Sequence, residues 1–314
     1  MPTDRPRVLA DLPVSPVVLE LVGDRVELVP WDSTGRIDAI YTYGHPTVDA
    51  AMLDRLPGVR VVSNFGVGVD HIDLRATAAR GIPVGNTPGI LDGATADLAF
   101  ALILAAGRRV VEGDRYARGP HFTHYDPTLI LGREVHGSTL GVVGMGRIGR
   151  QVAKRAQGFG MTVLYHNRTR SEEAEVALKA RYATKDELLA TSDYVVLTVP
   201  LTDETRGLIG RAELAQMKPT ATLVNVARGA VVDKDALAEA LRGKKIHAAA
   251  LDVTDPEPLP RDHPLLQLDN VIITPHLGSA TEETRRRMAE VSVENLFAGL
   301  EGKPLPFRVN LPGQ

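Results

Sequence analysis

The sequence predicts an α/β fold built from two doubly wound parallel-sheet domains, and two observations carry this prediction. Short runs rich in β-branched residues alternate with amphipathic segments in two separate series, one from residue 7 to about residue 100 and another from residue 139 onward. Such alternation is typical of a parallel sheet with helices on both faces. The length of 314 residues also points to two domains, because one domain usually takes roughly 100–200 residues.

The first series contains five predicted strands and two predicted helices. The strands are RVLADL (7–12), RVELVP (25–30), DAIYTYG (38–44), VRVVSNFG (59–66) and IPVGNTP (82–88). The helices cover 48–56 and 73–81, and Gly81 closes the second as a C-cap. A segment that is apolar all round, 93–111, predicts a helix that begins near Thr95 and Asp97 and is buried between layers or domains.

The second series begins with a strand that enters a glycine turn, TLGVVGMG (139–146), followed by a helix at 147–160. Further strands are predicted at 162–167, 193–200, 221–229, 247–253 and 270–275, with a helix at 233–243 among them. A last helix, 281–300, leaves an extended tail from Gly302 to Gln314.

Composition and charge exclude several classes of function. With 36 Lys and Arg against 39 Asp and Glu, the net charge of −3 gives no basic stripe for nucleic acid. The absence of Cys excludes disulfides, zinc ribbons, thiolate-held iron–sulfur clusters and Cys nucleophiles. No metal-site spacing such as H-E-x-x-H occurs, so we expect no metal. The N-terminus shows no secretory signal, and the most apolar stretch is about half a membrane span, so we expect a cytoplasmic protein without membrane contact.

Four glycines at the start of the second series point to a dinucleotide. Gly141, Gly144, Gly146 and Gly149 spell G-x-x-G-x-G-x-x-G, and the motif follows an apolar strand and opens an amphipathic helix. We expect Gly144 to allow the tight turn, Gly146 to let a pyrophosphate approach the backbone, and Gly149 to let helix pack on strand. The sequence therefore predicts a Rossmann cofactor domain.

The end of the next strand indicates which dinucleotide binds. An NAD site usually carries an acidic residue about 20 positions after the glycines, but position 166 is His, and Asn167, Arg168, Thr169 and Arg170 follow. These side chains suit a 2′-phosphate, which favours NADP(H), with NAD(H) possible. The alternative is that both arginines are ordinary solvated surface residues.

Three later strands each end in a reactive side chain. Arg228 follows NVA, the segment LDVTDPEP offers Asp252, Asp255 and Glu257, and TPHLGSAT offers His276. The carboxyl ends of parallel strands share one edge of a sheet, so we expect these groups to face one crevice. An Arg, a carboxylate and a His suit a 2-oxo acid, because the guanidinium grips the carboxylate and the imidazole protonates the ketone oxygen.

These segments, with NFGVGVDHID (64–73) and VPLTDETRGLIG (199–210), resemble D-isomer-specific 2-hydroxyacid dehydrogenases over essentially the whole chain, and most closely their glyoxylate/hydroxypyruvate reductase branch. The resemblance implies Arg228 as the carboxylate and carbonyl binder, Glu257 as the imidazole's partner and His276 as general acid. It implies that Val67 and Gly68 also bind substrate. The positions expected along the dinucleotide are Thr95, Gly144, Gly146, Arg147, Ile148, Gly149, Asn167, Arg168, Thr169, Val199, Pro200, Thr205, Val226, Ala227, Asp252 and Gly278.

The resemblance further implies a flavodoxin-like substrate domain, residues 1–98 completed by 285–314, a Rossmann domain at 99–284, a cleft between them, and a homodimer. The expected reaction is NADPH-dependent reduction of glyoxylate or hydroxypyruvate to glycolate or D-glycerate. One departure concerns Leu129, which stands where some of these reductases carry a Trp. Alternatives are a D-3-phosphoglycerate dehydrogenase, which normally uses NAD, and a non-catalytic dinucleotide sensor like the corepressors that share this fold.

Overall fold

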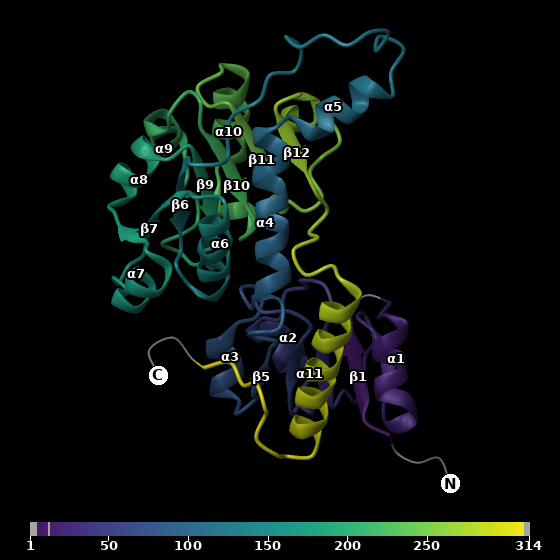
Figure 1. The fold of residues 1–314 in the computed structure, drawn as a ribbon. Coiled ribbons are helices and arrows are strands. Elements are labelled where there is room, and N and C mark those ends of the chain that lie inside the picture. The colour runs from purple at the N-terminus through teal and green to yellow at the C-terminus, as the bar shows by residue number, and fades with distance from the viewer. Residues whose placement is uncertain (1–4, 12, 311–314) are drawn as a thin grey trace. The chain divides into compact units, whose positions relative to one another are not determined.

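The computed structural model describes residues 5–11 and 13–310, which form two compact units. One consists of the described parts of Met1–Leu91 and Thr281–Gln314, and the other is Asp92–Ala280 (Figure 1). The boundaries fall at 91/92 and 280/281 rather than at the expected 98/99 and 284/285. Both lie next to the start of a helix: α4 (Asp92–Gly107) belongs whole to the second unit, and α11 (Glu282–Leu300) to the first.

The first unit is a five-stranded parallel sheet in the order β2-β1-β3-β4-β5, the flavodoxin-like order. Its strands are β1 (Arg7–Ala10), β2 (Glu27–Pro30), β3 (Ala39–Thr42), β4 (Val62–Asn64) and β5 (Val84–Gly85). Its helices are α1 (Pro16–Val22), α2 (Ala50–Arg55), α3 (Leu74–Ala79) and α11. The predicted strand at 7–12 reaches residue 12, which lies outside the described residues.

Two hydrogen bonds tie α11 to this sheet. The Tyr41 and Ser292 hydroxyls lie 2.7 Å apart, and the Ser63 hydroxyl donates to the Ser292 carbonyl at 2.6 Å. The side chains of α2 and α3 contribute Leu53 and Ala76 to an apolar cluster that also holds buried strand residues. The last segment of the sequence therefore completes the unit that the first segment starts.

The second unit is a seven-stranded parallel sheet in the order β12-β11-β10-β9-β6-β7-β8. The strands are β6 (Thr139–Val143), β7 (Thr162–His166), β8 (Arg181–Tyr182), β9 (Tyr194–Leu197), β10 (Thr222–Asn225), β11 (Ala248–Leu251) and β12 (Val271–Ile273). The helices are α4, α5 (Val110–Ala117), α6 (Arg147–Gly158), α7 (Glu172–Leu178), α8 (Lys185–Thr191), α9 (Arg211–Gln216) and α10 (Lys234–Arg242). The order matches the Rossmann arrangement extended by one strand. From β6 the chain adds strands first on one side (β7, β8) and then on the other (β9 onward), so the strand order reverses between β6 and β9.

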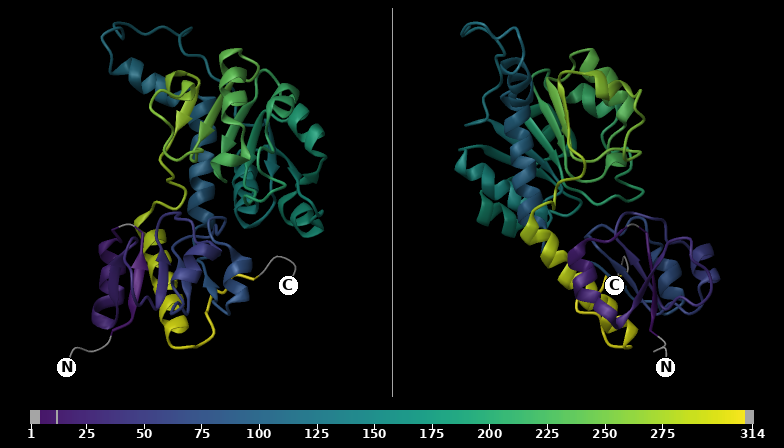
Figure 2. Two further views of the ribbon diagram at one scale, coloured as in Figure 1. Left: turned by 180° about the vertical axis from the view of Figure 1, so that it is seen from behind. Right: turned by 90° about the vertical axis from the view of Figure 1, so that its right-hand side faces the viewer.

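Helices cover both faces of this sheet (Figure 2). Because strand side chains alternate, Leu223 packs with α8, α9 and α10 on one face, whereas its neighbour Val224 packs with α4 and α6 on the other. Strands buried on both faces explain the continuous apolar runs in the sequence. No helix among the described residues is long and apolar enough to cross a membrane.

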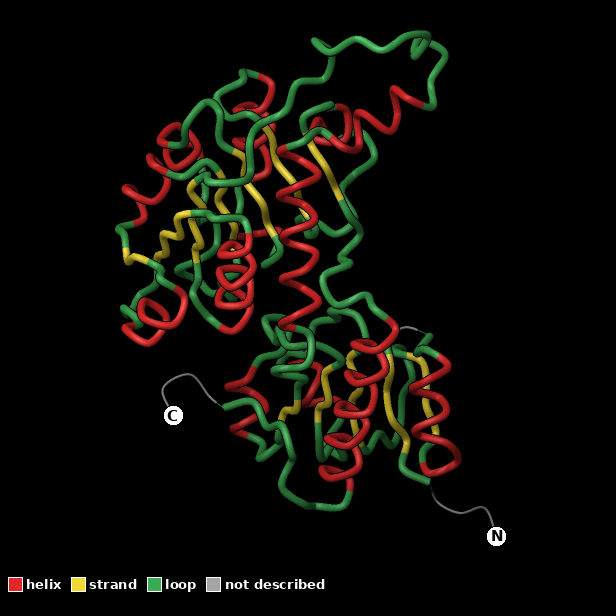
Figure 3. The backbone as a smooth tube through the Cα atoms, in the orientation of Figure 1, coloured by secondary structure: helices red, strands yellow, loops and turns green. Residues whose placement is uncertain are grey.

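The predicted helix at 93–111 is two helices in the structure. α4 begins at Asp92, ahead of the expected start near Thr95, and ends at Gly107, where Arg109 adopts a left-handed φ of 52°. α5 then runs to Ala117 and leads into a long loop that extends away from the body of the unit (Figure 3). We call residues 120–134 the arm; all of them except Ile130 are exposed.

Candidate active site

The glycine turn follows β6, next to the point where the strand order reverses. Gly144 has a φ of 103°, and a side chain at Gly149 would collide with the Gly144 carbonyl oxygen, so both positions require glycine. Gly146 is the N-cap of α6; a Cβ added there would meet no atom within 4 Å, and no side chain caps the helix. The first N–H groups of α6 are therefore available to an anion, as a dinucleotide phosphate requires.

Among the residues that follow β7, some side chains contact other parts of the protein and others do not. The Asn167 side chain accepts a hydrogen bond from the Met145 backbone at 2.7 Å, so it holds the glycine turn in place. Arg170 donates to Glu175 at 2.7 and 2.6 Å, and hydrogen bonds from Arg170 and then Tyr165 lower the pKa of Glu175 to about 2. Arg168 is exposed and has no hydrogen bond or ion pair with any described residue. Of the two predicted arginines, Arg170 is thus held by an ion pair, whereas Arg168 is not.

Arg228 follows β10 in a turn that a buried asparagine organises. Asn225 ends the strand, accepts from the Ala227 N–H at 3.0 Å and donates to the Arg228 carbonyl at 2.9 Å. A Cβ at Gly229 would overlap the backbone of Thr254, so the turn lies directly against the loop that carries Glu257. This close approach brings the segments of Arg228 and Glu257 side by side.

Asp252 organises the loop that carries His276. Its carboxylate is 2% exposed and accepts hydrogen bonds from the Thr274 hydroxyl at 2.6 Å and from two backbone N–H groups, Leu277 at 2.7 Å and Gly278 at 2.8 Å. Its carbonyl accepts from the His276 N–H at 2.9 Å. The Asp252 carboxylate therefore holds this loop together, and its expected place along the dinucleotide stays a prediction.

His276 and Glu257 form a hydrogen-bonded pair. Nδ1 of His276 lies 2.9 Å from Oε1 of Glu257, and His276 has a left-handed φ of 56°. A carboxylate only accepts, so this contact places a proton on Nδ1 and leaves Nε2 for another partner. A non-glycine residue in the left-handed region costs free energy, and such residues cluster at active sites.

Comparisons with known proteins show the family of this chain. Residues 100–278 match the family model described as the D-isomer specific 2-hydroxyacid dehydrogenase, NAD binding domain. The chain is 45% identical to a glyoxylate reductase of Aeropyrum pernix, over 98% of this chain and 96% of that protein. The chain belongs to the D-isomer specific 2-hydroxyacid dehydrogenase family. It is therefore an NAD(P)-dependent oxidoreductase, as the sequence predicted.

Two similar solved structures contain different dinucleotides. An NADPH-dependent glyoxylate/hydroxypyruvate reductase from Sinorhizobium meliloti, in complex with NADP and malonate, superposes with a TM-score of 0.88 at 32% identity, covering 97% of each chain. A D-lactate dehydrogenase from Aquifex aeolicus, complexed with NAD and lactic acid, gives 0.87 at 29% identity, covering 98% of this chain and all of that one. A nicotinamide dinucleotide is the cofactor of this dehydrogenase as well.

The other expected cofactor positions of the dehydrogenase all lie in its second unit. Thr95 and Gly278 adjoin Asp252, because a Cβ on Gly278 would lie 3.3 Å from atoms of both. Thr205 donates to the Pro200 carbonyl at 2.7 Å and so braces the loop after β9. Arg147 begins α6. Burial raises the pKa of Asp92, and the positive charge of Arg147 lowers it in part. The remaining positions are Ile148 in α6, the exposed Thr169, Val199 after β9, and Val226 and Ala227 after β10.

Val67 and Gly68 lie in the first unit, in the turn after β4. The Asn64 side chain donates to the carbonyls of Gly66 and Gly68 at 3.0 Å, and Asn86 donates to the Val67 carbonyl at 2.9 Å. The N–H groups of Val67 and Gly68 donate no hydrogen bond to any described residue. This turn therefore presents two free amide donors.

Sequence reasoning missed the residues that hold these turns. Asn225 and Asn64 each end a buried strand of three or four residues, and a polar side chain at that place is the signal that could have identified them. Among the described residues, no three His, Asp or Glu side chains gather in a way that could hold a metal ion.

Proposed function

We propose that this dehydrogenase reduces a short 2-oxo acid, glyoxylate or hydroxypyruvate, to glycolate or D-glycerate, with NADPH as the preferred cofactor. The observation that carries the proposal is the His276–Glu257 pair, held beside the Arg228 turn at the sheet edge where the glycine turn lies. The glyoxylate reductase of Aeropyrum pernix supports the substrate class, and the NADPH-dependent reductase of Sinorhizobium meliloti supports the cofactor.

The chain's own groups divide the work of the reaction. A bound reduced nicotinamide supplies the hydride. Arg228 grips the substrate carboxylate and polarises the carbonyl, because a guanidinium presents two parallel N–H donors. His276 gives the proton from Nε2 to the oxygen that becomes the hydroxyl, and Glu257 stabilises the imidazolium through Nδ1. The amides of Val67 and Gly68 are further donors for a carboxylate.

Arg168 supports the preference for NADPH. It is exposed and unpaired among the described residues, and position 166 holds a His whose Nδ1 lies 3.1 Å from the Ala183 carbonyl, where NAD enzymes usually place an acid. A guanidinium attracts a 2′-phosphate, whereas a carboxylate would repel it.

The test is turnover of the purified protein. NADPH and, separately, NADH are followed by absorbance with glyoxylate, hydroxypyruvate or 3-phosphohydroxypyruvate as substrate. We expect fast NADPH oxidation with the first two substrates and weak activity with NADH. Preference for NADH and the phosphorylated substrate would indicate a phosphoglycerate dehydrogenase. Dinucleotide binding without turnover of any short 2-oxo acid would indicate a sensor.

We also propose a homodimer in which the arm packs on a second copy. Four large apolar side chains on the arm are exposed, Phe122, Tyr125, Leu129 and Leu131, with exposures of 52%, 81%, 43% and 67%. Apolar side chains gathered on one protruding segment mark an interaction site.

Light scattering tests the dimer with a matched pair of variants. We expect Leu131→Asp to yield monomers, whereas Val176→Asp, which charges an even more exposed apolar position on α7, leaves the dimer intact. A wild-type protein that runs as a monomer at micromolar concentration would refute the proposal.

A further inference from the structure

One peptide unit of the glycine turn, the one that joins Gly144 to Met145, is held at both ends by side chains. The Thr198 hydroxyl donates to the Gly144 carbonyl at 2.5 Å, and the Met145 N–H donates to Oδ1 of Asn167 at 2.7 Å. Thr198 directly follows β9 and Asn167 directly follows β7, the two strands that flank β6. We call these two side chains the clamp, because they hold one peptide from the two neighbours of the strand that leads into the turn.

The clamp takes over where the backbone hydrogen bonds of the sheet end. The Gly144 N–H still donates to the His166 carbonyl at 2.9 Å, and the Thr198 N–H donates to the Val143 carbonyl at 2.9 Å. Every residue except proline carries the groups for such backbone bonds. The two clamp bonds depend instead on a side-chain hydroxyl and a side-chain amide oxygen. The orientation of the clamped peptide is thus determined by the sequence of two other segments.

The glycine in this turn makes such a clamp necessary. Gly144 has a φ of 103°, and glycine adopts positive and negative φ about equally well, so this residue alone does not fix the peptide that follows it. Rotation of that peptide would turn its carbonyl away from Thr198 and its N–H away from Asn167, and it would break both hydrogen bonds. Because α6 starts at Arg147, two residues after Met145, the orientation of the peptide determines where the first N–H groups of the helix point.

The Thr198 hydroxyl lies where the turn, the helix and the loop after β9 meet. A Cβ added to Gly149 would lie 3.0 Å from this hydroxyl and would collide with the Gly144 carbonyl oxygen. A Cβ added to Gly144 would lie 2.9 Å from backbone atoms of Thr198 and Val199. The hydroxyl also lies 3.4 Å from the Val143 carbonyl, farther than from its acceptor on Gly144. The two glycines therefore leave room for the contact between hydroxyl and carbonyl.

We propose that Thr198 is a positioning residue for the dinucleotide. Together with Asn167 it fixes one orientation of the Gly144–Met145 peptide, and it thereby directs the N–H groups at the start of α6 toward the pyrophosphate. The N-terminus of a helix binds phosphate through backbone N–H groups that point at the ligand. NADPH and NADH carry the same pyrophosphate, so the proposal depends neither on the substrate nor on the preference between the two cofactors.

The affinity of the full-length protein for NADP⁺ and, separately, for NAD⁺ tests the proposal by calorimetry. Thr198→Val keeps the shape of the side chain and removes the hydroxyl, whereas Thr198→Ser keeps the hydroxyl. We expect the Kd of Thr198→Val to rise at least fivefold, by the same factor for both dinucleotides, a size that the loss of one hydrogen bond can explain. The Kd of Thr198→Ser should stay within twofold of the wild-type value.

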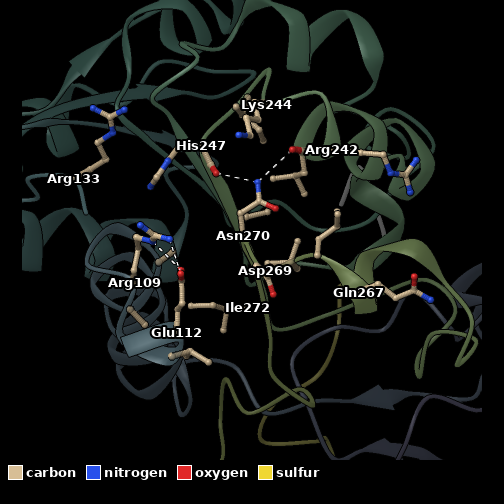
Figure 4. A pocket seen from close by; sticks show the side chains of 18 of the residues that line it. Arg109, Glu112, Arg133, Arg242, Lys244, His247, Gln267, Asp269, Asn270 and Ile272 are labelled. Carbon is tan, nitrogen blue, oxygen red and sulfur yellow. Dashed lines mark hydrogen bonds and ion pairs between the residues drawn. The ribbon is translucent and has the colours of Figure 1, made fainter. Parts of the chain in front are cut away.

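Two control variants separate this effect from a general loss of stability. Thr222→Val removes a buried hydroxyl of β10 that has no hydrogen-bond partner among the described residues. Asn270→Ala removes a side chain that donates to the carbonyls of His247 at 3.1 Å and Leu241 at 3.3 Å, at the amino end of the strands (Figure 4). Asn270→Ala should lower the free energy of unfolding in urea. Neither control should change the Kd of either dinucleotide more than twofold.

Steady-state kinetics give a second readout. Thr198→Val should raise the KM for NADPH and for NADH by similar factors, whereas kcat at saturating cofactor should change less. The reason is that within the described ranges the clamp forms no hydrogen bond with the turns that carry Arg228 and His276.

Wild-type affinity for both dinucleotides in a folded Thr198→Val variant would overturn the proposal. A Kd that rises for NADP⁺ alone would also overturn it, because Thr198 would then act on the 2′-phosphate and not on the pyrophosphate. If Thr198→Val does not fold, Thr198→Ala and Thr198→Ser give the same comparison. Equal Kd values in these two variants would then decide against a role for the hydroxyl.

Discussion

The Asp252 carboxylate and the Gly278 backbone N–H form a 2.8 Å hydrogen bond that joins the end of β11 to the loop after β12. The same carboxylate accepts from Thr274 and Leu277, on either side of His276. The segment that carries His276 is therefore held in place by a buried carboxylate at the end of the neighbouring strand.

Asp252→Asn should destabilise this loop and impair catalysis. The substitution replaces one acceptor oxygen by a donor NH₂ that faces existing donors, and a buried unsatisfied group costs about 1–3 kcal/mol. We expect that loss in the free energy of unfolding in urea, together with a fall in kcat. Thr274→Val is the matched control, because it removes one hydroxyl donor and leaves both backbone donors; its loss should be smaller, about 0.5–1.5 kcal/mol. Equal stability of Asp252→Asn and wild type would contradict this account.

At position 276, backbone conformation and chemistry can be separated by two substitutions. Asn tolerates a left-handed φ, so His276→Asn should keep wild-type stability and lose nearly all turnover. His276→Val also lacks the acid but places a β-branched residue at φ 56°, so it should lose stability in addition, by about 1–3 kcal/mol. Thermal unfolding and steady-state kinetics on both variants give the comparison, and substantial turnover by His276→Asn would exclude His276 as the proton donor.

Arg228→Lys should show the value of the guanidinium fork. Lys keeps the positive charge but offers a single point donor, so the carboxylate and the carbonyl lose their paired contact. Loss of an oriented donor at a developing charge costs on the order of 10²–10³ in rate, and we expect a fall of this size in kcat/KM. Arg228→Ala should fall further, and near-normal kcat/KM in Arg228→Ala would refute the assignment.

The two arginines after β7 should differ in their effect on the cofactor. Arg168→Ala should lower kcat/KM for NADPH at least tenfold and leave the value for NADH within about twofold, because only NADPH carries the phosphate. Arg170→Ala is the control; it removes the partner of Glu175 and should leave the NADPH/NADH ratio unchanged. Equal ratios in Arg168→Ala and wild type would mean that another residue reads the phosphate.

His247 should make stability depend on pH. Burial, and then the charges of Arg133 and Arg109, lower its folded-state pKa below the ordinary value of 6.5, so the unfolded chain binds more protons in this range. The contribution of His247 is fully present above pH 6.5 and is lost as pH falls below it. We expect the urea midpoint to fall less steeply from pH 7 to pH 5 in His247→Asn than in wild type. Parallel pH profiles for the two proteins would contradict this.

Continuous apolar runs in the sequence predicted most strands, because each strand of a sheet covered by helices on both sides is apolar on both faces. Longer amphipathic or apolar segments predicted the long helices. Some short helices were not predicted, among them α1 and α7 with seven residues each, although the six-residue helices α2 and α3 were. Three glutamates in the first turn make α7 largely polar. The break between α4 and α5 depends on one left-handed residue, Arg109, which no periodicity reveals.

The candidate site was predictable as a set of chemical groups and less so as a network. Arg228, Glu257 and His276 stand out because each follows a strand. The contacts that hold their segments do not, since the Asp252 carboxylate accepts from Thr274, 22 residues later in the sequence, and Asn225 acts through main-chain groups. The hydrogen bond from the Met145 N–H to Asn167 was likewise not evident from the sequence, and the place of Asn167 on the cofactor stays a prediction.

The contact between Gly229 and the main chain at Thr254 has a consequence for sequence change in this protein. Backbone atoms make this contact on both sides, so it does not depend on which side chains stand at positions 254 and 255. Mutation can therefore change the side chains of the loop before Glu257, while Gly229, where no side chain fits, keeps the spacing between this loop and the Arg228 turn.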